Sequence, residues 1–424
     1  MRVGLFTESF DPVINGVSTS VKTLACEMAK SGHTSLIVAP EYPGFSDEAR
    51  DLPEGVEIRR LPSWRIAVNP ENPFAFPPIP FLPLPEAYRD EKLDVVHTQQ
   101  PFGIGLHGQV AARRAGVPLV STFHTLYLEY AHYVPVVPKA ITRGIASRYL
   151  ARYYGTCAAV VTPSRVMRDL LVSLGVSAER LHVVPTGIPL APVVLPAARD
   201  RVRETYNIPP YAPILLFVGR LAAEKNLDAL LAAFAAISEA HPVPSPETHP
   251  FLLFVGSGPY RERCEQRVRE MGLAVYVRFA GFLSRQQIAP IYAASTLFVF
   301  PSLTETQGVV VSEAQSFGLP CVLMRGGGAS EFVRPDEDAI VTAPEVGVFA
   351  EAIRALLENG DERRRLARNA LRNPLRPTPE GMAHTLLALY RDLTARTGTG
   401  RRTGNPLRLV GNVSQQDEES HRQT

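Results

Sequence analysis

The segment ILLFVGRLAAEKNLDALLAAFAAIS (residues 214–238) contains one complete strand-to-helix unit. Its first five residues are all apolar, which is typical of a strand buried on both faces of a parallel sheet. Residues 227–238 carry apolar side chains at helical spacing, as a helix that covers such a sheet requires. The turn between them contains Gly219, Arg220 and Lys225, and it therefore places two cations where the strand ends.

Strand-like and helix-like runs alternate along most of the chain. This alternation predicts an α/β protein with two Rossmann-like parallel-sheet domains that face each other across a cleft. The expected strands are residues 3–7, 35–39, 56–61, 95–98, 119–123, 160–163, 182–185, 214–218, 252–255, 277–280, 297–300, 321–324 and 339–342. The expected helices are residues 17–30, 105–114, 227–238, 261–270, 285–293, 310–317, 346–357, 362–370 and 379–394.

Changes in composition indicate the domain boundaries. We expect an N-terminal Rossmann-like domain at residues 1–188, a proline-rich linker at 189–210 and a C-terminal Rossmann-like domain at 211–375. The last helix, within 376–395, has no strand to cover, so we expect it to cross back to the N-terminal domain. Residues 396–424 lack apolar periodicity and are predicted to form a disordered tail.

The overall composition excludes several classes of protein. The 424 residues include 44 Lys and Arg against 42 Asp and Glu, and this net charge of +2 argues against bulk nucleic-acid binding. The four cysteines are scattered, which argues against a zinc ribbon or a disulfide framework. No signal peptide and no apolar run of about 18 residues is present, so we expect a cytoplasmic protein without a membrane span.

Arg220 and Lys225 are suited to bind a diphosphate. Both follow a strand and lie beside the predicted amino terminus of a helix, where cations and free backbone amides hold phosphate oxygens. Lysine is scarce, with five in the chain, so one at such a turn is notable. The alternative is a solvated loop with ordinary charges.

A second segment, ETQGVVVSE, runs from Glu305 to Glu313 after the strand at 297–300. Carboxylates suit sugar and ribose hydroxyls, because each oxygen accepts hydroxyl hydrogens. The backbone amides of Gln307, Gly308 and Val309 are expected at a helix amino terminus, where they can bind hydroxyl or phosphate oxygens. The alternative is an acidic first turn that only favours the helix dipole, with Glu313 at the surface.

The two segments together, GR-x4-K and E-x7-E, resemble the retaining glycosyltransferases of family 4, which have the GT-B fold. Three motifs in the first half agree with this resemblance, which covers roughly residues 1 to 390. They are the glycine loop Asn15-Gly16-Val17, the strand end Thr122-Phe123-His124-Thr125 and the segment Val184-Pro185-Thr186-Gly187-Ile188 before the linker.

The resemblance implies roles for the donor-binding residues. Gly16 would let the backbone approach the donor diphosphate, and Arg220 and Lys225 would neutralise that diphosphate as it leaves. Glu305 would bind hydroxyls of the transferred sugar, and Glu313 would bind the ribose. The N-terminal domain would then bind the acceptor and the C-terminal domain the nucleotide sugar.

The resemblance also implies that His124 lies against the sugar near the reacting carbon. Without the resemblance, the preferred interpretation of His124 is a structural histidine at a strand end whose hydrogen bonds are made within the protein. Retention would arise by front-face attack, with the departing phosphate oxygen accepting the acceptor's proton, so we assign no general base. We expect no cofactor and no metal, because the D-x-D sequence at residues 336–338 lies far from the phosphate motifs and is interpreted as a solvated loop.

Two segments depart from the family pattern on the acceptor side. The family often has His-x-His-x-Pro where this chain reads His97-Thr98-Gln99-Gln100-Pro101, so the second histidine is missing. The usual Gly-Gly-x-Pro-Glu is replaced by Gly327-Gly328-Ala329-Ser330-Glu331. Neither departure removes a residue assigned above.

The acceptor is expected to be a membrane lipid. Tyr127, Tyr130 and His132 belong to an aromatic connection that resembles the branch of the family that glucosylates diacylglycerol. The proline-rich residues 62–85 are predicted to form no regular ladder and to present apolar side chains at the mouth of the cleft. A predicted helix carries four cations close together that could attract anionic lipid: Lys139, Arg143, Arg148 and Arg152.

These features predict a retaining hexosyltransferase that moves glucose from UDP-glucose to a lipid such as diacylglycerol, at the inner face of the cell membrane. One alternative is the same transfer to a soluble or polysaccharide acceptor. Others are a UDP-sugar epimerase with the same architecture, a Rossmann oxidoreductase and a two-lobed sugar-binding protein. The first strand lacks a following G-x-G-x-x-G, which disfavours the oxidoreductase.

Overall fold

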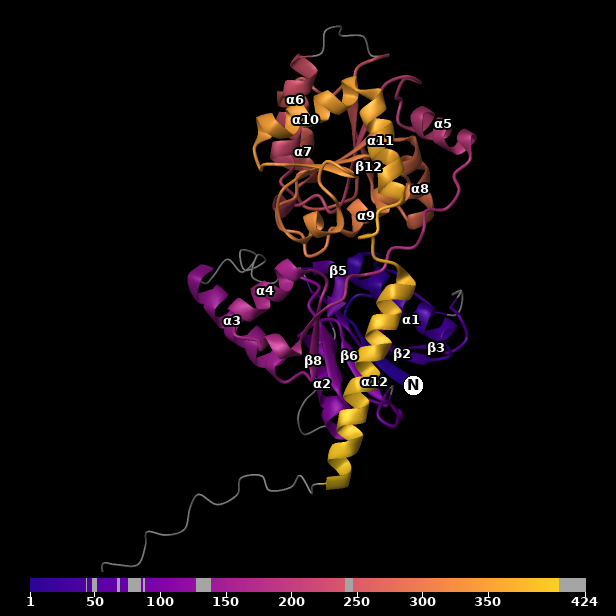
Figure 1. The fold of residues 1–424 in the computed structure, drawn as a ribbon, viewed down its shortest axis with the longest axis vertical. Helices are drawn as coiled ribbons and strands as arrows, with labels where there is room; N and C mark the ends of the chain where they lie inside the picture. Colours follow the sequence, from indigo (N-terminus) through magenta and orange to yellow (C-terminus); the bar gives the residue numbers. More distant parts are fainter. Residues whose placement is uncertain are drawn as a thin grey trace, which may run out of the picture.

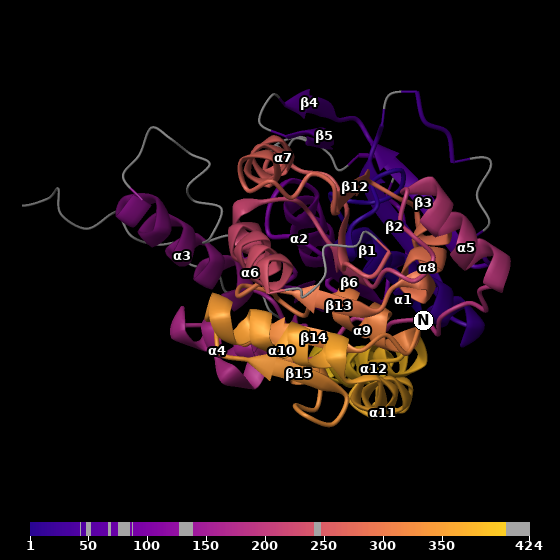
Figure 2. The same cartoon turned by 90° about the horizontal axis from the view of Figure 1, so that it is seen from above.

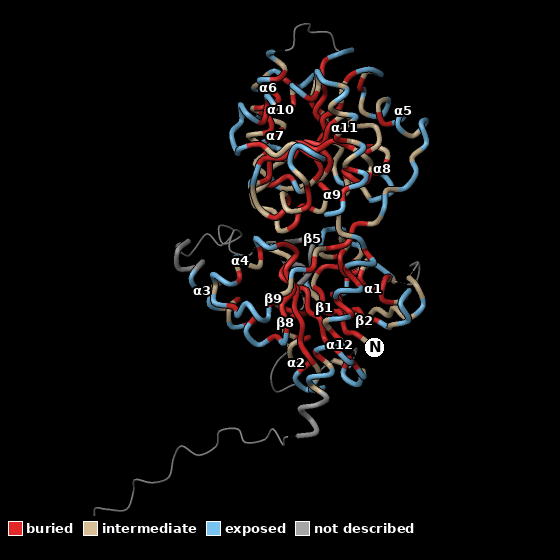
Figure 3. The backbone as a smooth tube through the Cα atoms, viewed as in Figure 1, coloured by how far each residue is buried: buried red, intermediate tan, exposed pale blue. Residues whose placement is uncertain are grey.

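The computed structural model describes residues 1–42, 44–47, 52–66, 69–74, 85–86, 88–126, 139–240 and 247–403. Two α/β domains follow one another in the chain and stack along the long axis of the molecule (Figure 1). Buried residues run through the centre of each domain, so each has its own core (Figure 3). The architecture is the predicted pair of parallel-sheet domains.

The N-terminal sheet has seven strands in the order β3-β2-β1-β6-β7-β8-β9, all parallel. The order reverses between β1 and β6, and ligands of such sheets bind in the crevice beyond the carboxyl ends of the strands at this switch point. The strands are β1 (Arg2–Phe6), β2 (Thr34–Pro40), β3 (Val56–Leu61), β6 (Val95–Thr98), β7 (Leu119–Thr122), β8 (Ala159–Thr162) and β9 (Leu181–Val183).

Helices cover both faces of this sheet, because alternate strand residues point to opposite sides. Leu5 packs with Leu24 in the core beneath one set of helices, whereas Phe6 packs with Ile104 and Leu150 beneath the other set. The helices of the domain are α1 (Gly16–Lys30), α2 (Gly103–Ala115), α3 (Lys139–Gly155) and α4 (Arg165–Ser173).

The proline-rich segment forms a short ladder, contrary to the prediction. Two strands, β4 (Trp64–Ile66) and β5 (Asn69–Phe74), pair antiparallel as an isolated two-stranded sheet. Prolines are tolerated there because both strands are edges, where the missing N–H need not pair with a neighbour. Residues 75–84 lie outside the described residues, so the predicted apolar mouth is not described beyond Phe74.

The C-terminal sheet has six parallel strands in the order β12-β11-β10-β13-β14-β15, with its switch point between β10 and β13. Strands β13, β14 and β15 lie side by side in the view from above (Figure 2). The strands are β10 (Ile214–Val218), β11 (Phe251–Val255), β12 (Val277–Gly281), β13 (Leu297–Phe300), β14 (Cys321–Met324) and β15 (Ala339–Thr342). Its helices are α6 (Leu227–Glu239), α7 (Arg261–Glu270), α8 (Arg285–Ala294), α9 (Val309–Ser316), α10 (Val346–Glu358) and α11 (Gly360–Leu371).

A helix lies within the segment predicted as the linker. Helix α5 (Pro196–Thr205) starts at a proline, whose missing N–H costs nothing in a first turn, and it packs against α8. Val202 joins the C-terminal core. The linker predicted at 189–210 is therefore not one continuous connection, because residues 196–205 belong to the C-terminal domain.

The last helix runs back along the N-terminal domain beside α1 (Figure 1). Helix α12 (Pro379–Thr403) buries Leu386, Leu387 and Tyr390 in the core beneath α1. Residues 396–403, predicted as part of a disordered tail, continue this helix, and residues 404–424 lie outside the described residues.

His97 anchors this returning helix to the sheet. Its Nδ1 lies 2.5 Å from the Tyr390 hydroxyl and its Nε2 lies 2.7 Å from the Thr122 hydroxyl. The residue is 1% exposed, and burial, together with the nearby His124, lowers the pKa of His97 to about 3. The imidazole is therefore neutral in the folded protein at neutral pH.

We expect acidification to destabilise the protein partly through His97. Its folded pKa lies below the unfolded value of about 6.5, so between these values only the unfolded chain binds the proton. The His97 contribution to the free energy of unfolding should fall by about 2 kcal/mol from pH 7 to pH 5. Urea unfolding at both pH values should show a smaller pH difference for His97→Asn, whereas the exposed control His384→Asn should retain the wild-type difference. An unchanged difference in His97→Asn would contradict the assignment.

Candidate functional site

A partly buried ion pair crosses the switch point of the C-terminal sheet. Lys225 lies in the turn after β10 and Glu305 in the loop after β13, and Lys225 Nζ lies 2.5 Å from Glu305 Oε1. The side chains are 19% and 13% exposed, so the pair is held largely out of water. The structure therefore brings together the cation and the carboxylate that the sequence placed 80 residues apart.

Asn226 and Thr304 hold these two loops against each other. Asn226 has a positive φ of 56° and its side-chain amide donates to the carbonyl of Pro301. The Thr304 hydroxyl donates to the carbonyl of Glu224. Lys225 and Glu305 thus lie on loops whose backbones are fixed, which is what pre-organised electrostatic binding requires.

Arg220 is exposed at the end of β10, beside a glycine-rich backbone contact. Gly256, at the end of β11, lies so close to the preceding turn that a Cβ would come within 1.9 Å of the Gly219 carbonyl oxygen. Gly258 contacts the Leu221 carbonyl in the same way. These glycines pack the loops after β10 and β11 closely together, with Arg220 exposed beside them.

Glu313 lies on α9 and is partly buried against α8. Its Oε2 accepts a hydrogen bond from the Tyr292 hydroxyl at 3.1 Å. Burial raises the pKa of Glu313, although the Tyr292 hydrogen bond and the charge of Arg285 act in the opposite direction. One carboxylate oxygen is held by Tyr292, and the predicted ribose-binding role would use the other.

Gly308 shapes the amino terminus of α9. It has a positive φ of 74°, and a Cβ would come within 2.5 Å of the Ala329 Cβ, so glycine is required. No side chain caps this helix end. The Val311 N–H donates to the Gly308 carbonyl at 2.9 Å, whereas the N–H of Val309, the first helical residue, has no intrahelical acceptor and is available for the predicted anion or hydroxyl contact.

The Gln307 side chain joins the two domains. It accepts from the Thr186 N–H at 2.8 Å and donates to the Thr186 carbonyl at 2.9 Å, and Gln307 is 2% exposed. Beside it, the Ser164 hydroxyl donates to the Thr306 carbonyl at 2.6 Å. The side chain of Gln307 is therefore engaged between the domains, and its backbone amide is the group left for the predicted donor contact.

Glu331 supplies a further contact between the domains. Its two carboxylate oxygens accept from the backbone N–H groups of Arg165 and Val166, at 2.9 and 2.8 Å. These groups form the start of α4, where a negative charge also offsets the helix dipole. The sequence analysis gave no role to Glu331 or Thr186, since their partners lie more than a hundred residues away. We call these contacts, made by Gln307, Thr306 and Glu331, the domain seam.

His124 lies at the carboxyl edge of the N-terminal sheet, after β7. Its Nε2 lies 2.8 Å from Oε1 of Gln99, at the end of the neighbouring β6. Burial lowers the pKa of His124 to about 4, so the imidazole is neutral at pH 7. Gln99, which stands where the family pattern has its second histidine, thus fixes the predicted sugar-facing histidine.

Gly16 begins α1 at the same edge of the sheet. Asn15 caps this helix by accepting from the N–H groups of Val17 and Ser18. A Cβ on Gly16 would contact nothing within 4 Å, so the space beside this backbone is open. The space beside Gly16 would allow the predicted approach of a diphosphate. No neighbouring atom of the folded chain requires a glycine at this position.

The predicted acceptor and membrane residues are described only in part. Tyr127, Tyr130 and His132 lie outside the described residues. The four predicted cations occupy α3, but positions 139 and 143 are about half a turn from positions 148 and 152 at 3.6 residues per turn. The expectation that they lie close together was therefore wrong, because their spacing divides them between two sides of the helix. Arg148 and Arg152 are exposed, next to Ile145, which is 62% exposed.

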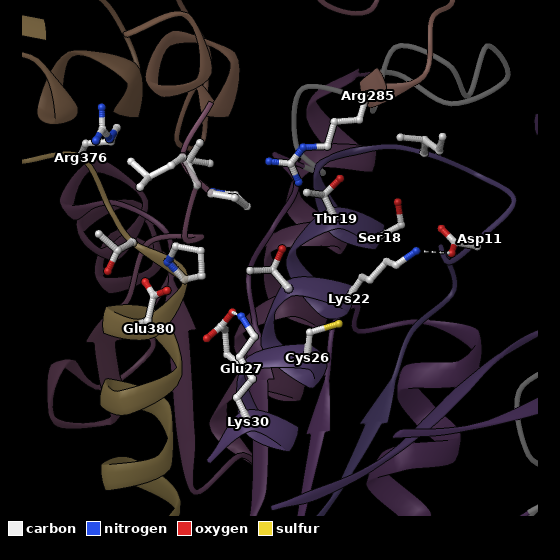
Figure 4. Close-up of a pocket in the computed structure, with 17 residues that line it drawn as sticks. Asp11, Ser18, Thr19, Lys22, Cys26, Glu27, Lys30, Arg285, Arg376 and Glu380 are labelled. Atoms are coloured by element: carbon white, nitrogen blue, oxygen red, sulfur yellow. Dashed lines mark hydrogen bonds and ion pairs between the residues drawn. The ribbon is translucent and has the colours of Figure 1, made fainter. Parts of the chain in front are cut away.

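A cavity of about 640 Å³ opens between the domains where the chain connects them (Figure 4). It is lined by α1 residues, by residues 188–190 and 376–380, and by Arg285. The predicted donor residues Lys225, Glu305 and Glu313 do not line it. Arg285 links the two regions, because its charge also acts on Glu313.

The last residue of the D-x-D segment, Asp338, is part of the buried core. Asp338 is fully buried and accepts from the Gln315 amide and from the Arg334 guanidinium and N–H. The expectation of a solvated loop was therefore wrong for Asp338. Among the described residues no group of three metal-ligating side chains occurs, and none of their helices is long and apolar enough to span a bilayer.

Two Rossmann-like parallel-sheet domains, stacked with a charged pair at the second switch point, are the architecture of a GT-B glycosyltransferase. Comparison with known families agrees: residues 14–191 match the family described as Glycosyltransferase Family 4, and residues 198–373 match Glycosyl transferases group 1. The chain belongs to glycosyltransferase family 4.

The named relatives carry the names of different glycosyl transfer reactions. The chain is 31% identical to the alpha-monoglucosyldiacylglycerol synthase of Streptococcus pneumoniae, over 76% of this chain and 70% of the relative. It is 30% identical to a GDP-mannose-dependent alpha-mannosyltransferase of Mycobacterium tuberculosis, over 94% of this chain and 98% of the relative.

Solved structures share the fold. Sucrose-phosphate synthase from Thermosynechococcus elongatus aligns with a TM-score of 0.74 at 23% identity, over 93% of this chain and 100% of that one. HepE from Anabaena, solved with UDP and glucose, aligns with a TM-score of 0.71 at 19% identity over the same shares.

We expect Lys225→Ala and Glu305→Gln each to lower the turnover number for sugar transfer by about a hundredfold or more, because each removes a pre-organised polar group at the donor. Release of nucleoside diphosphate measures this rate. The exposed residues Lys92→Ala and Glu239→Gln serve as matched controls and should keep the wild-type rate. Wild-type turnover in Lys225→Ala or Glu305→Gln would contradict the assignment of the donor site.

Proposed function

We propose that this protein transfers glucose from UDP-glucose to a membrane lipid such as diacylglycerol, with retention of configuration. The observation that carries the donor half of the proposal is the partly buried Lys225–Glu305 pair, in which a cation and a carboxylate suited to hydroxyls share one switch point. The similarity to two alpha-monoglucosyldiacylglycerol synthases supports the acceptor half.

In this proposal the donor lies along the carboxyl edge of the C-terminal sheet. Arg220 and Lys225 neutralise the diphosphate, whose charge grows as the bond to the sugar breaks. Glu305 accepts hydroxyl hydrogens of the sugar, and Glu313 accepts those of the ribose. The amides at the start of α9, from Gln307 to Val309, bind the remaining oxygens.

The acceptor reaches the sugar from the N-terminal domain. Its hydroxyl oxygen attacks the anomeric carbon on the face from which the diphosphate leaves, and the departing phosphate oxygen takes the hydroxyl proton. His124 is neutral at pH 7, so it can hydrogen-bond the sugar without adding charge. No side chain is assigned as a general base, and no cofactor or metal is part of the proposal.

A second candidate is mannosyl transfer from GDP-mannose. The similarity to the mycobacterial mannosyltransferases supports it, because those alignments span nearly the whole length of both chains. Glucose and mannose differ at one hydroxyl, and no described residue separates them.

The donor and acceptor are tested together with labelled sugars. Purified protein is incubated with diacylglycerol liposomes and radiolabelled UDP-glucose, UDP-galactose or GDP-mannose, and the lipid is extracted. We expect labelled glycolipid from UDP-glucose, and none with the Lys225→Ala variant. Labelled lipid from GDP-mannose alone would establish the second candidate, and label in soluble acceptors alone would contradict a lipid acceptor.

We further propose that one face of α3 contacts anionic membrane. Ile145, Arg148 and Arg152 lie within about one quarter of the helix circumference, and all three are exposed. Each cation near an anionic surface contributes about 1 kcal/mol, so two cations and an isoleucine give reversible binding.

Reversing the two charges should weaken this contact. We expect the double variant Arg148→Glu, Arg152→Glu to bind more weakly in sedimentation with phosphatidylglycerol vesicles. Its membrane partition coefficient should be at least tenfold lower than that of the wild type. The matched control reverses Arg113 and Arg114, which are exposed at the far end of α2, and should bind like the wild type. Equal loss in both variants would show a nonspecific charge effect and contradict the α3 surface.

A further inference from the structure

The switch point of the N-terminal sheet holds a carboxylate that the proposed donor chemistry does not use. Glu8 follows β1, and its Oε1 accepts from the backbone N–H of Ile104 at 3.2 Å, in the first turn of α2. The N–H of Glu8 donates to the Gln100 side chain after β6 at 3.0 Å. Glu8 therefore crosses the first switch point as the Lys225–Glu305 pair crosses the second.

Only one oxygen of Glu8 is engaged. Among the described residues no hydrogen bond or ion pair uses Oε2, and this oxygen is not sealed from solvent. Burial raises the pKa of Glu8 to about 7, and the hydrogen bond from Ile104 only partly offsets this. A partly buried carboxyl group with one unpartnered oxygen, and with no cation against it among the described residues, is stabilised when a ligand completes its hydrogen bonding.

The groups beside Glu8 suit an uncharged, partly apolar ligand. Phe102 and Tyr149 stack with ring centroids 5.2 Å apart, and the Tyr149 hydroxyl donates to the Pro101 carbonyl. Gln99 is 2% exposed and uses one end of its amide on His124, while its Nε2 has no partner among the described residues. This edge of the sheet thus has spare hydrogen-bonding capacity next to an aromatic surface.

We propose that Glu8 binds the acceptor hydroxyl that receives the sugar, and that it selects neutral hydroxyl acceptors over phosphate-bearing ones. Oε2 accepts the hydroxyl hydrogen and orients the oxygen lone pair toward the anomeric carbon. Phe102 and Tyr149 contact the apolar part of the acceptor. This inference rests on the proposed sugar transfer.

The reaction balances without proton transfer to Glu8. The bond between the anomeric carbon and the diphosphate oxygen breaks as the bond to the acceptor oxygen forms. The hydroxyl hydrogen, which Oε2 accepts in the bound acceptor, turns from Oε2 to the departing diphosphate oxygen as the new bond forms, and the proton leaves on that oxygen. Glu8 holds the nucleophile in place and is unchanged at the end. Since no cation in the described part of the chain contacts Glu8, a phosphate on the acceptor at this point would lack a described partner for its charge.

The test separates acceptor binding from donor binding. Glu8→Gln keeps an oxygen for the Ile104 N–H, whereas Glu8→Ala removes both oxygens. We expect the KM for diacylglycerol to rise about tenfold in Glu8→Gln and about a hundredfold in Glu8→Ala, as for loss of a hydrogen bond to a charged group. The donor KM and the melting temperature of Glu8→Gln should match those of the wild type and of the exposed control Glu54→Gln.

An unchanged acceptor KM in both Glu8 variants, or an equal rise in donor KM, would overturn the inference while the proposed function stands. Wild-type protein that labels no diacylglycerol would instead overturn the proposed acceptor, and the same variants are then measured with the acceptor that it does use from a panel of neutral and phosphorylated polyols. Preference for a phosphorylated acceptor would overturn the role of Glu8. A neutral acceptor whose KM rises in the variants would support it.

Discussion

Parallel strands direct every following loop to the same edge of a sheet, and this constraint places all the functional groups of the protein. In the C-terminal sheet it brings Lys225 and Glu305 to one switch point, within 2.5 Å of each other. In the N-terminal sheet it places Glu8 and His124 at the equivalent edge. Loops at the two carboxyl edges contact each other, so the proposed donor and acceptor groups belong to edges that face one another.

The domain seam fixes how these edges face each other. Gln307 exchanges two hydrogen bonds with the Thr186 backbone, and Glu331 satisfies two N–H groups that begin α4. Both residues neighbour the loop that carries Glu305. A change in domain orientation would therefore act directly on the proposed donor site, since the same short segments carry the proposed sugar-binding residues and contact the partner domain.

Much of the fold follows from local patterns in the sequence. Strands such as residues 214–218 are apolar throughout, and a run of that length with a helix after it has few other stable arrangements. Apolar periodicity predicted secondary structure less well in the proline-rich segments. Proline excludes only the interior of helices and central strands, so it was compatible with α5 and with the β4–β5 hairpin, both of which were missed. The charges of α3 are close in the sequence, which predicted a cluster, but their helical angles place them on two sides of the helix.

The sequence by itself determined the two sheets, the positions where they end and therefore the residues near the cleft, because apolar periodicity and glycine-marked turns are local properties. Only the tertiary structure decided which of these residues meet. Lys225 and Glu305 are 80 positions apart, and His97 and Tyr390 are 293 apart. The free oxygen of Glu8, the bonded amide of Gln307 and the cap supplied by Glu331 depend on neighbours from distant segments, and no local pattern specifies such neighbours.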